Sequence, residues 1–247
     1  MASWQYRYQA VSIDGFVEQL VRYVNTGHYF YVTGRIPVGK LPDKIDQKLL
    51  SRYGIAMPRW ERARRKQAGM ASVHYLRFEE RFILVATHGE HPFFESHTPE
   101  QISDCRRIGI KFGGYSIRRT FCQRAKKWHT LVRLDKPTYL ALRAHLLELA
   151  TRRSATALEE TIQSICFQPY RPVREQLLAM VRAVNRKRKA AGLASIDFHC
   201  VRSRRRITKP FGAGNQEDEV NMCCYSSFAN TGSTASGKMR PISSATD

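Results

Sequence analysis

DQKLLSRYGIAMPRWERARR, residues 46–65, decides the fold that we predict for the first third of the chain. The pattern predicts a helix over residues 43–53 and, from Pro58, a second helix that Gly69 brings to an end. The apolar side chains on the inner face of the first helix are Ile45, Leu49 and Leu50. Gly54 lies between the two helices, where glycine adopts a positive φ without the steric penalty of a Cβ atom. The segment therefore predicts two short helices joined by a tight turn.

The flanking residues add a helix, a strand and a hairpin to this pair. Residues 14–25 carry apolar side chains at helical spacing, and Asp14 is a candidate N-cap. Residues 28–36 are aromatic and β-branched, which favours a strand. Residues 71–87 alternate in polarity around Glu79-Glu80, so we expect a hairpin that turns at the two acids.

This order of elements resembles a known class of DNA-binding domain. The segment 46–65 resembles the helix-turn-helix of bacterial regulators and recombinases, with Gly54 at the turn. Its apolar positions are occupied by Leu49, Tyr53, Ile55, Trp60 and Ala63. With the hairpin that follows, the resemblance extends over residues 14–87 to the winged helix. It implies that the second helix enters a DNA groove and that the hairpin tip contacts the DNA backbone or minor groove.

The helical period assigns two faces to the second helix. We expect Trp60, Ala63 and Gln67 to face the core, so that Arg62 and Arg65 point the opposite way. In a helix-turn-helix complex these two arginines would enter the groove, where arginine pairs bidentately with guanine. Three further cations on the flanks suit phosphate contacts: Arg59, Arg64 and Lys66.

The positive charge of the chain is concentrated in three stretches. Lys and Arg number 41 against 21 Asp and Glu, which gives a net charge of +20. Residues 52–66 carry six cations against one acid, residues 106–127 carry eight against none, and residues 182–209 carry ten against one. Such clustering is the electrostatic signature of phosphate binding, so nucleic acid is the partner that we expect.

From these clusters we select the residues expected to contact nucleic acid. They are Arg59, Arg62, Arg64, Arg65, Lys66, Arg118, Arg119, Lys126, Lys127, Arg186, Lys187, Arg188, Lys189, Arg204, Arg205 and Arg206. The alternative to DNA is RNA, as for a ribonucleoprotein subunit. Strand aromatics could stack on unpaired bases, although such side chains are more often core: Phe112, Tyr115, Phe121 and Trp128.

An enzymatic interpretation depends on one group of histidines. His88 and His91 follow a strand and could serve a metal-dependent strand-nicking nuclease. Nucleases of that type have a single residue between the two histidines of a strand, so that both face the same side, whereas His88 and His91 are three positions apart. A zinc site that adds His97 and Cys105 fits no common structural spacing. The sequence therefore predicts no metal, no cofactor and no catalytic residue.

The rest of the chain predicts strands and then helices. We expect strands over 107–112, 115–121 and 128–134, and three later helices over 136–151, 155–165 and 173–191. The last segment, 212–247, is rich in Gly, Ser, Thr, Ala and Asn, which is typical of disorder. The six cysteines contain no C-x-x-C spacing and are interpreted as free thiols. No apolar run reaches the roughly 20 residues of a membrane span, and the N-terminus resembles no signal peptide, so we expect a cytoplasmic protein.

Together these patterns predict an α+β protein in three parts. Residues 1–100 would form a DNA-binding region similar to a winged helix, residues 101–211 a basic strand region with C-terminal helices, and residues 212–247 a disordered tail. By analogy of fold alone, this protein could be a regulator, a plasmid replication initiator, or a component of a mobile-element or defence system. Its partners would then include other proteins of a nucleoprotein complex.

Overall fold

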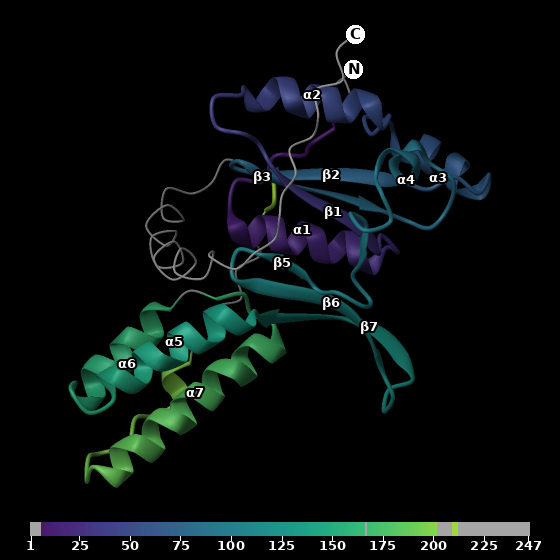
Figure 1. The fold of residues 1–247 in the computed structure, drawn as a ribbon. Coiled ribbons are helices and arrows are strands. Elements are labelled where there is room, and N and C mark those ends of the chain that lie inside the picture. Colours follow the sequence, from purple (N-terminus) through teal and green to yellow (C-terminus); the bar gives the residue numbers. More distant parts are fainter. Residues whose placement is uncertain (1–5, 166, 202–208, 212–247) are drawn as a thin grey trace.

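The structure is a computed structural model that describes residues 6–165, 167–201 and 209–211. These residues form an α+β fold with two antiparallel sheets (Figure 1). The first part comprises α1 (Ile13–Asn25), β1 (Phe30–Arg35), α2 (Pro42–Arg52), α3 (Arg59–Gln67), β2 (Val73–Phe78), β3 (Arg81–Ala86), α4 (Pro92–Ser96) and β4 (Ser103–Asp104). The second comprises β5 (Ile110–Phe112), β6 (Tyr115–Cys122), β7 (Lys127–Leu134), α5 (Lys136–Leu149), α6 (Ala155–Ser164), α7 (Arg171–Ala190) and the 3-10 helix η1 (Phe198–Cys200).

The larger sheet is a central layer that is buried on both faces. Its strand order is β2-β3-β1-β4, and β3 pairs along its whole length with both β2 and β1. Ile83 and Val85 of β3 belong to one hydrophobic cluster, whereas Phe82 and Leu84 belong to the other. Because neighbouring side chains on a strand point to opposite faces, this run of apolar residues supplies both clusters at once.

Helix α1 lies between the two sheets, and α2 lies on the other side of the larger sheet (Figure 1). The apolar face of α1 packs in the same cluster as Leu76 of β2 and Val132 of β7. Phe16 of α1 stacks on Phe112 of β5, with ring centroids 3.7 Å apart. The smaller sheet, ordered β5-β6-β7, is therefore held to the larger one through α1.

A buried polar network holds α2 on the larger sheet. Asp46 of α2 is completely buried and accepts hydrogen bonds from Tyr75 Oη at 2.5 Å and Arg77 Nε at 2.9 Å. Arg77 also donates to the carbonyl of Glu79 at 2.9 Å. Since both partners of Asp46 come from β2, the carboxylate fixes the position of the helix against that strand.

The C-terminal helices extend the first hydrophobic cluster beyond the smaller sheet. The apolar stripe of α7 is buried and consists of Val173, Leu177, Met180, Val181 and Val184. These side chains share one cluster with α1 and with β5–β7, so the hydrophobic core crosses residue 100. Gln176 of α7 also exchanges two hydrogen bonds with the backbone of Leu134, which holds α7 against β7.

The sequence predicted most of these elements correctly. Every predicted helix and strand is present within a few residues of its expected bounds, including the β2–β3 hairpin that turns at Glu79 and Glu80. Gly54 has the positive φ, 55°, that the turn was expected to require. The α1 cap is a correction, because Ser12 rather than Asp14 accepts the hydrogen bond from the Gly15 N–H. Helix α4 and strand β4 were not predicted, since five and two residues are too few to show a period.

Several predicted features lie outside the described residues. They are Arg204, Arg205, Arg206, three of the six cysteines and the segment 212–247. Among the helices of the described part, none has both the length and the apolar character that crossing a bilayer requires.

Candidate nucleic-acid interface

The far end of the β6–β7 hairpin is a two-stranded ribbon that extends beyond the rest of its sheet. Strand β5 pairs with Tyr115–Ile117 of β6, and within the part of the chain that the structure describes no third strand joins the hairpin past that point. Strands β6 and β7 remain paired with each other as far as Cys122 and Lys127. Figure 1 shows the end of this hairpin projecting away from the helices. We call residues 118–131 the basic ribbon.

Hydrogen bonds hold the base of the basic ribbon to the body of the protein. Arg119 donates to Asn25 Oδ1 at the end of α1, at 2.8 Å, and Thr130 Oγ1 donates to the same atom at 2.7 Å. The backbone N–H of Arg119 also donates to the carbonyl of Cys105 at 3.1 Å. Because both strands bond to one side chain of α1, the ribbon leaves the body in a defined direction.

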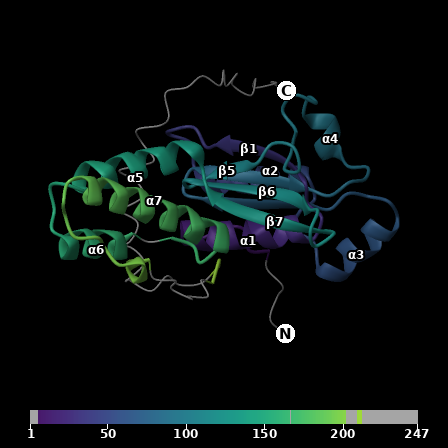
Figure 2. The same cartoon turned by 90° about the horizontal axis from the view of Figure 1, so that it is seen from below.

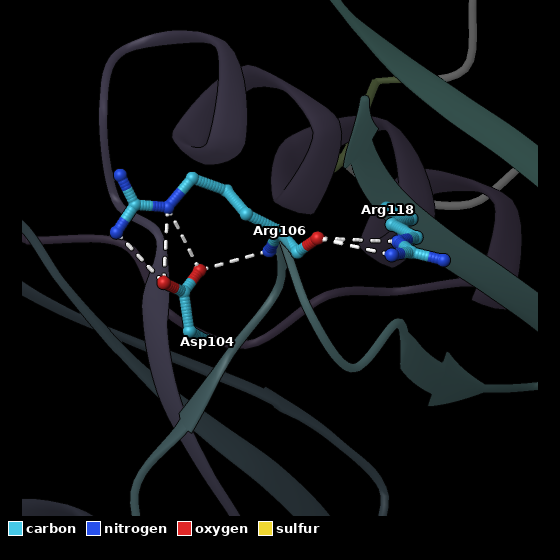
Figure 3. Close-up of polar contacts among 3 residues, drawn as sticks. All are labelled: Asp104, Arg106 and Arg118. Atoms are coloured by element: carbon cyan, nitrogen blue, oxygen red, sulfur yellow. Dashed lines mark hydrogen bonds and ion pairs between the residues drawn. The ribbon is translucent and has the colours of Figure 1, made fainter. Parts of the chain in front are cut away.

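A second set of contacts joins the ribbon to the loop after β4 (Figure 3). The guanidinium of Arg118 donates through Nε and Nη2 to the carbonyl of Arg106, each at 3.2 Å. Arg106 in turn donates its backbone N–H and its guanidinium to Asp104, with a shortest distance of 2.7 Å. Desolvation raises the pKa of Asp104, but the hydrogen bonds from Arg106 outweigh it and hold that pKa below its usual range. Arg118 remains exposed despite these contacts, so its unused donors are available to a ligand.

Positive side chains gather on the outer face of the smaller sheet. Ser116 pairs with Lys111 on one side and Arg133 on the other, so these two cations share a face. Strand alternation adds Arg118 and Lys127 to the same face. All four cations are exposed, and the chain contains no acid from residue 106 to residue 134. Figure 2, which views the molecule from this side, shows β6 and β7 in front of α2.

Strand alternation could have identified two cations that the predicted set of contact residues omitted. The predicted set included the exposed Arg118, Lys126 and Lys127 and the half-buried Arg119, but it omitted Lys111, Arg124 and Arg133, which are exposed. The period of two, applied with the register of three paired strands, was the signal that could have found Lys111 and Arg133.

The four strand aromatics divide into two pairs. Phe112 and Tyr115 are buried core residues, as strand aromatics usually are. Phe121 and Trp128 are 40% and 50% exposed and face each other across the ribbon. Their ring centroids lie 5.5 Å apart in an edge-to-face arrangement. Alternation places these two rings on the face opposite to Arg118 and Lys127, so the basic ribbon carries exposed aromatic side chains on one face and exposed cations on the other face and at its tip.

The predicted faces of α3 are wrong. Trp60 is 65% exposed and Ala63 is exposed, whereas Arg62 turns inward. Its guanidinium donates to the carbonyls of Ile55, Met57 and Val73, and lies over the Tyr6 ring. The carbonyls of Ile55 and Met57 belong to the turn before α3 and that of Val73 to the start of β2, and buried carbonyls require donors. A guanidinium with five N–H groups supplies them, so the arginine is buried in preference to the tryptophan.

Other cations of α3 remain accessible. Arg59, Arg64 and Lys66 are exposed, and Arg65 forms an ion pair with Glu61 at 3.2 Å. An open groove of about 450 Å³ separates α3 from α2 and is lined by residues that include Leu50, Gly54, Met57 and Arg65. The two helices are thus not in close contact along this groove.

The C-terminal basic helix is also only partly available. Arg188 is 3% exposed and donates to the carbonyls of Ala150, Arg153 and Ala194, so it is a structural residue and not part of an exposed basic surface. Lys187 donates to the carbonyl of Leu147 at 2.7 Å but stays exposed. Arg186 and Lys189 are exposed. The helical period could have identified Arg188, because it lies four residues after the buried Val184.

The histidine group does not assemble into a metal site. Within residues 6–165, 167–201 and 209–211, no three His, Cys, Asp or Glu side chains lie close enough together to hold a metal ion. His91 Nδ1 accepts the Phe93 N–H at the start of α4, and His97 Nδ1 donates to the carbonyl of Phe93. Burial raises the pKa of the Cys105 thiol to about 11. Comparisons of the chain with protein-family models, curated proteins and solved structures give no match.

Proposed function

We propose that this protein binds nucleic acid without catalysing a reaction, and that the basic ribbon with the outer face of β5–β7 is its main contact surface. The observation that supports this most directly is the acid-free stretch from residue 106 to residue 134, whose exposed cations lie on one sheet face and one projecting hairpin. A net charge of +20 adds long-range attraction for a polyanion.

The structural contacts of the interface favour binding over a merely solvated surface. Asp104 neutralises Arg106, whereas Lys111, Arg124, Lys126, Lys127 and Arg133 have no ion pair among the described residues. Unpaired cations of one sign repel each other, which costs stability unless a polyanion relieves it. When these cations neutralise nucleic-acid phosphates, bound counterions are released, so the affinity should depend strongly on the salt concentration.

The test is a salt titration of binding with matched charge variants. The double variant Lys126→Gln/Lys127→Gln should weaken binding of a labelled oligonucleotide, measured by fluorescence anisotropy. It should also reduce the slope of log Kd against log salt by about 0.7–0.9 for each phosphate contact that is lost. Lys40→Gln/Lys44→Gln is the control, because it removes the same charge from exposed positions near α2. Equal losses in the two double variants would show that net charge alone drives binding and would contradict the proposed surface.

A second candidate is duplex DNA recognition by α3. It is supported by the order α1, β1, α2, α3, β2, β3, by the positive φ of Gly54 and by the exposed Arg59 and Arg64. Arg62 would have no part in it, since its guanidinium is bonded to three backbone carbonyls. In this case Arg59→Ala/Arg64→Ala should weaken duplex binding more than Lys126→Gln/Lys127→Gln does, measured in the same assay.

A further inference from the structure

We infer that the basic ribbon selects unpaired nucleic-acid strands, by stacking bases on Phe121 and Trp128. This deepens the proposed function and depends on it. The two rings are the exposed aromatic pair of the ribbon, and they lie between the structured base at Arg119 and the cationic tip at Arg124 and Lys126.

The exposure of the two rings needs a reason beyond the stability of the hairpin. Cross-strand aromatic pairs do stabilise two-stranded ribbons, and this pair is directly opposed in the register. However, Trp128 leaves half of its surface in water and Phe121 leaves 40%, and neither ring belongs to a hydrophobic cluster. Large aromatic faces beside unpaired cations are the combination with which proteins bind single strands.

The spacing of the rings favours an unpaired strand over a duplex. Their centroids are 5.5 Å apart and their planes are inclined by 63°. Successive bases in a duplex strand rise by only roughly 3.4 Å and stay parallel, so they cannot use both rings. A single strand can extend and splay its bases, and its phosphates then lie within reach of the long side chains at the tip. The absence of any acid from residue 106 to residue 134 fits a polyanion and does not fit a basic partner.

The experiment compares single strands and a duplex on aromatic variants of the ribbon. The probes are a labelled 20-nucleotide oligo-dT, the matching oligo-U and a 20-base-pair duplex, all at one salt concentration. Phe121→Thr/Trp128→Thr keeps strand-forming residues but removes both rings. Phe121→Tyr/Trp128→Tyr retains two aromatic faces. Trp60→Thr is the matched control, because it removes an exposed tryptophan from α3.

We expect the Thr variant to bind both single strands about tenfold or more weakly and the duplex nearly unchanged. The Tyr variant should restore most of the single-strand affinity, and Trp60→Thr should leave it intact. Single-strand binding should also quench tryptophan fluorescence in Trp4→Phe/Trp60→Phe, in which Trp128 is the one remaining of the three tryptophans. The relative loss for oligo-dT and oligo-U shows whether the 2′-hydroxyl contributes.

Three outcomes separate this inference from the proposed function. No binding of any probe by the native protein would overturn both. Salt-dependent binding that the Thr variant leaves unchanged would overturn the stacking and retain the phosphate surface. Equal losses for single strands and duplex, which the Tyr variant restores, would show that the rings only maintain the ribbon and would also overturn the selection of unpaired strands.

Discussion

The protein contains two hairpins that are alike in local structure and opposite in environment. The β2–β3 hairpin and the β6–β7 hairpin are both antiparallel, and each turn holds a non-glycine residue at positive φ: Glu79 at 51° and Lys126 at 48°. The first hairpin is buried on both faces by the two hydrophobic clusters. The second leaves its cluster after Ile117 and Val132 and continues into solvent as the basic ribbon.

The difference shows that packing, and not hairpin geometry, decides how much of each hairpin is exposed to solvent. Arg77 of the first hairpin is enclosed with Asp46, and Glu80 at its tip pairs with Arg35 at 2.7 Å. These two charges are thus paired within the protein. The tip of the second hairpin carries Arg124 and Lys126 with no acid nearby in the sequence. Substitutions in the first hairpin should therefore affect stability, and those in the second should affect binding.

The largest effect is expected from removing the carboxylate of the buried network. Asp46→Ala would leave the Arg77 guanidinium and the Tyr75 hydroxyl buried without their partner. Breaking a buried pair in this way costs about 3–5 kcal/mol. Urea unfolding should show this loss in the free energy of unfolding, with the slope unchanged.

Asp43→Ala is the matched control, because the Asp43 side chain is 83% exposed and lies 3.8 Å from the same arginine. Exposed ion pairs contribute at most about 1 kcal/mol, so this variant should unfold nearly as the native protein does. Similar losses in the two variants would contradict the assignment of the buried network as the main support of this hairpin.

The sequence predicted the elements of both hairpins but only part of their roles. Alternation and turn residues are local properties, which is why the strands around Glu79 and the strands around Lys126 could be located correctly. The predicted wing was the first hairpin, because it follows α3 in the chain. Which hairpin is enclosed depends on α1 lying between the sheets, and that packing involves residues as far apart as Phe16 and Phe112.

Helix α3 shows a second limit of prediction from sequence. Hydrophobicity placed Trp60 inside and Arg62 outside, and the structure reverses them. The orientation of the helix is decided by backbone carbonyls in the turn before α3 and at the start of β2, which accept hydrogen bonds from the Arg62 guanidinium. No sequence pattern reports where such carbonyls will be buried, whereas the position of an exposed cation such as Lys127 follows from alternation alone.

A smaller effect is expected on acidification, and it too concerns the first hairpin. His28 is 5% exposed beside His74 of β2, and burial lowers its pKa to about 4 from the usual 6.5. The unfolded state therefore takes up a proton as the pH falls through 6.5, while the folded state does not until about pH 4. The contribution of neutral His28 to the free energy of unfolding is fully present above pH 6.5. It is lost as the pH falls to about 4, by on the order of 3 kcal/mol.

The measurement is the free energy of unfolding between pH 7.5 and pH 4.5, compared with one variant and one control. His28→Asn retains a donor for the carbonyl of Tyr23 and should reduce the pH dependence, while the part from buried His74, whose pKa is also lowered by burial, remains. His88→Asn changes an exposed histidine and should not. A native protein whose stability is constant over this range would contradict a neutral, buried His28.

The smallest effect compares the two turns directly. Glu79→Gly and Lys126→Gly each replace a side chain at positive φ, where L-residues are strained and glycine is not. The gain is partly offset by the greater freedom of glycine in the unfolded chain. We therefore expect the free energy of unfolding, measured by thermal unfolding, to rise by about 0.5 kcal/mol in both variants.

Only Lys126→Gly should weaken oligonucleotide binding, because only that turn lies on the proposed interface. A lysine at a strained backbone position lowers the stability of the protein, and such a local cost is expected where the charge serves binding. If both glycine variants bound nucleic acid as the native protein does, the strain at Lys126 would have no connection with a ligand, and the two hairpins would differ in burial alone.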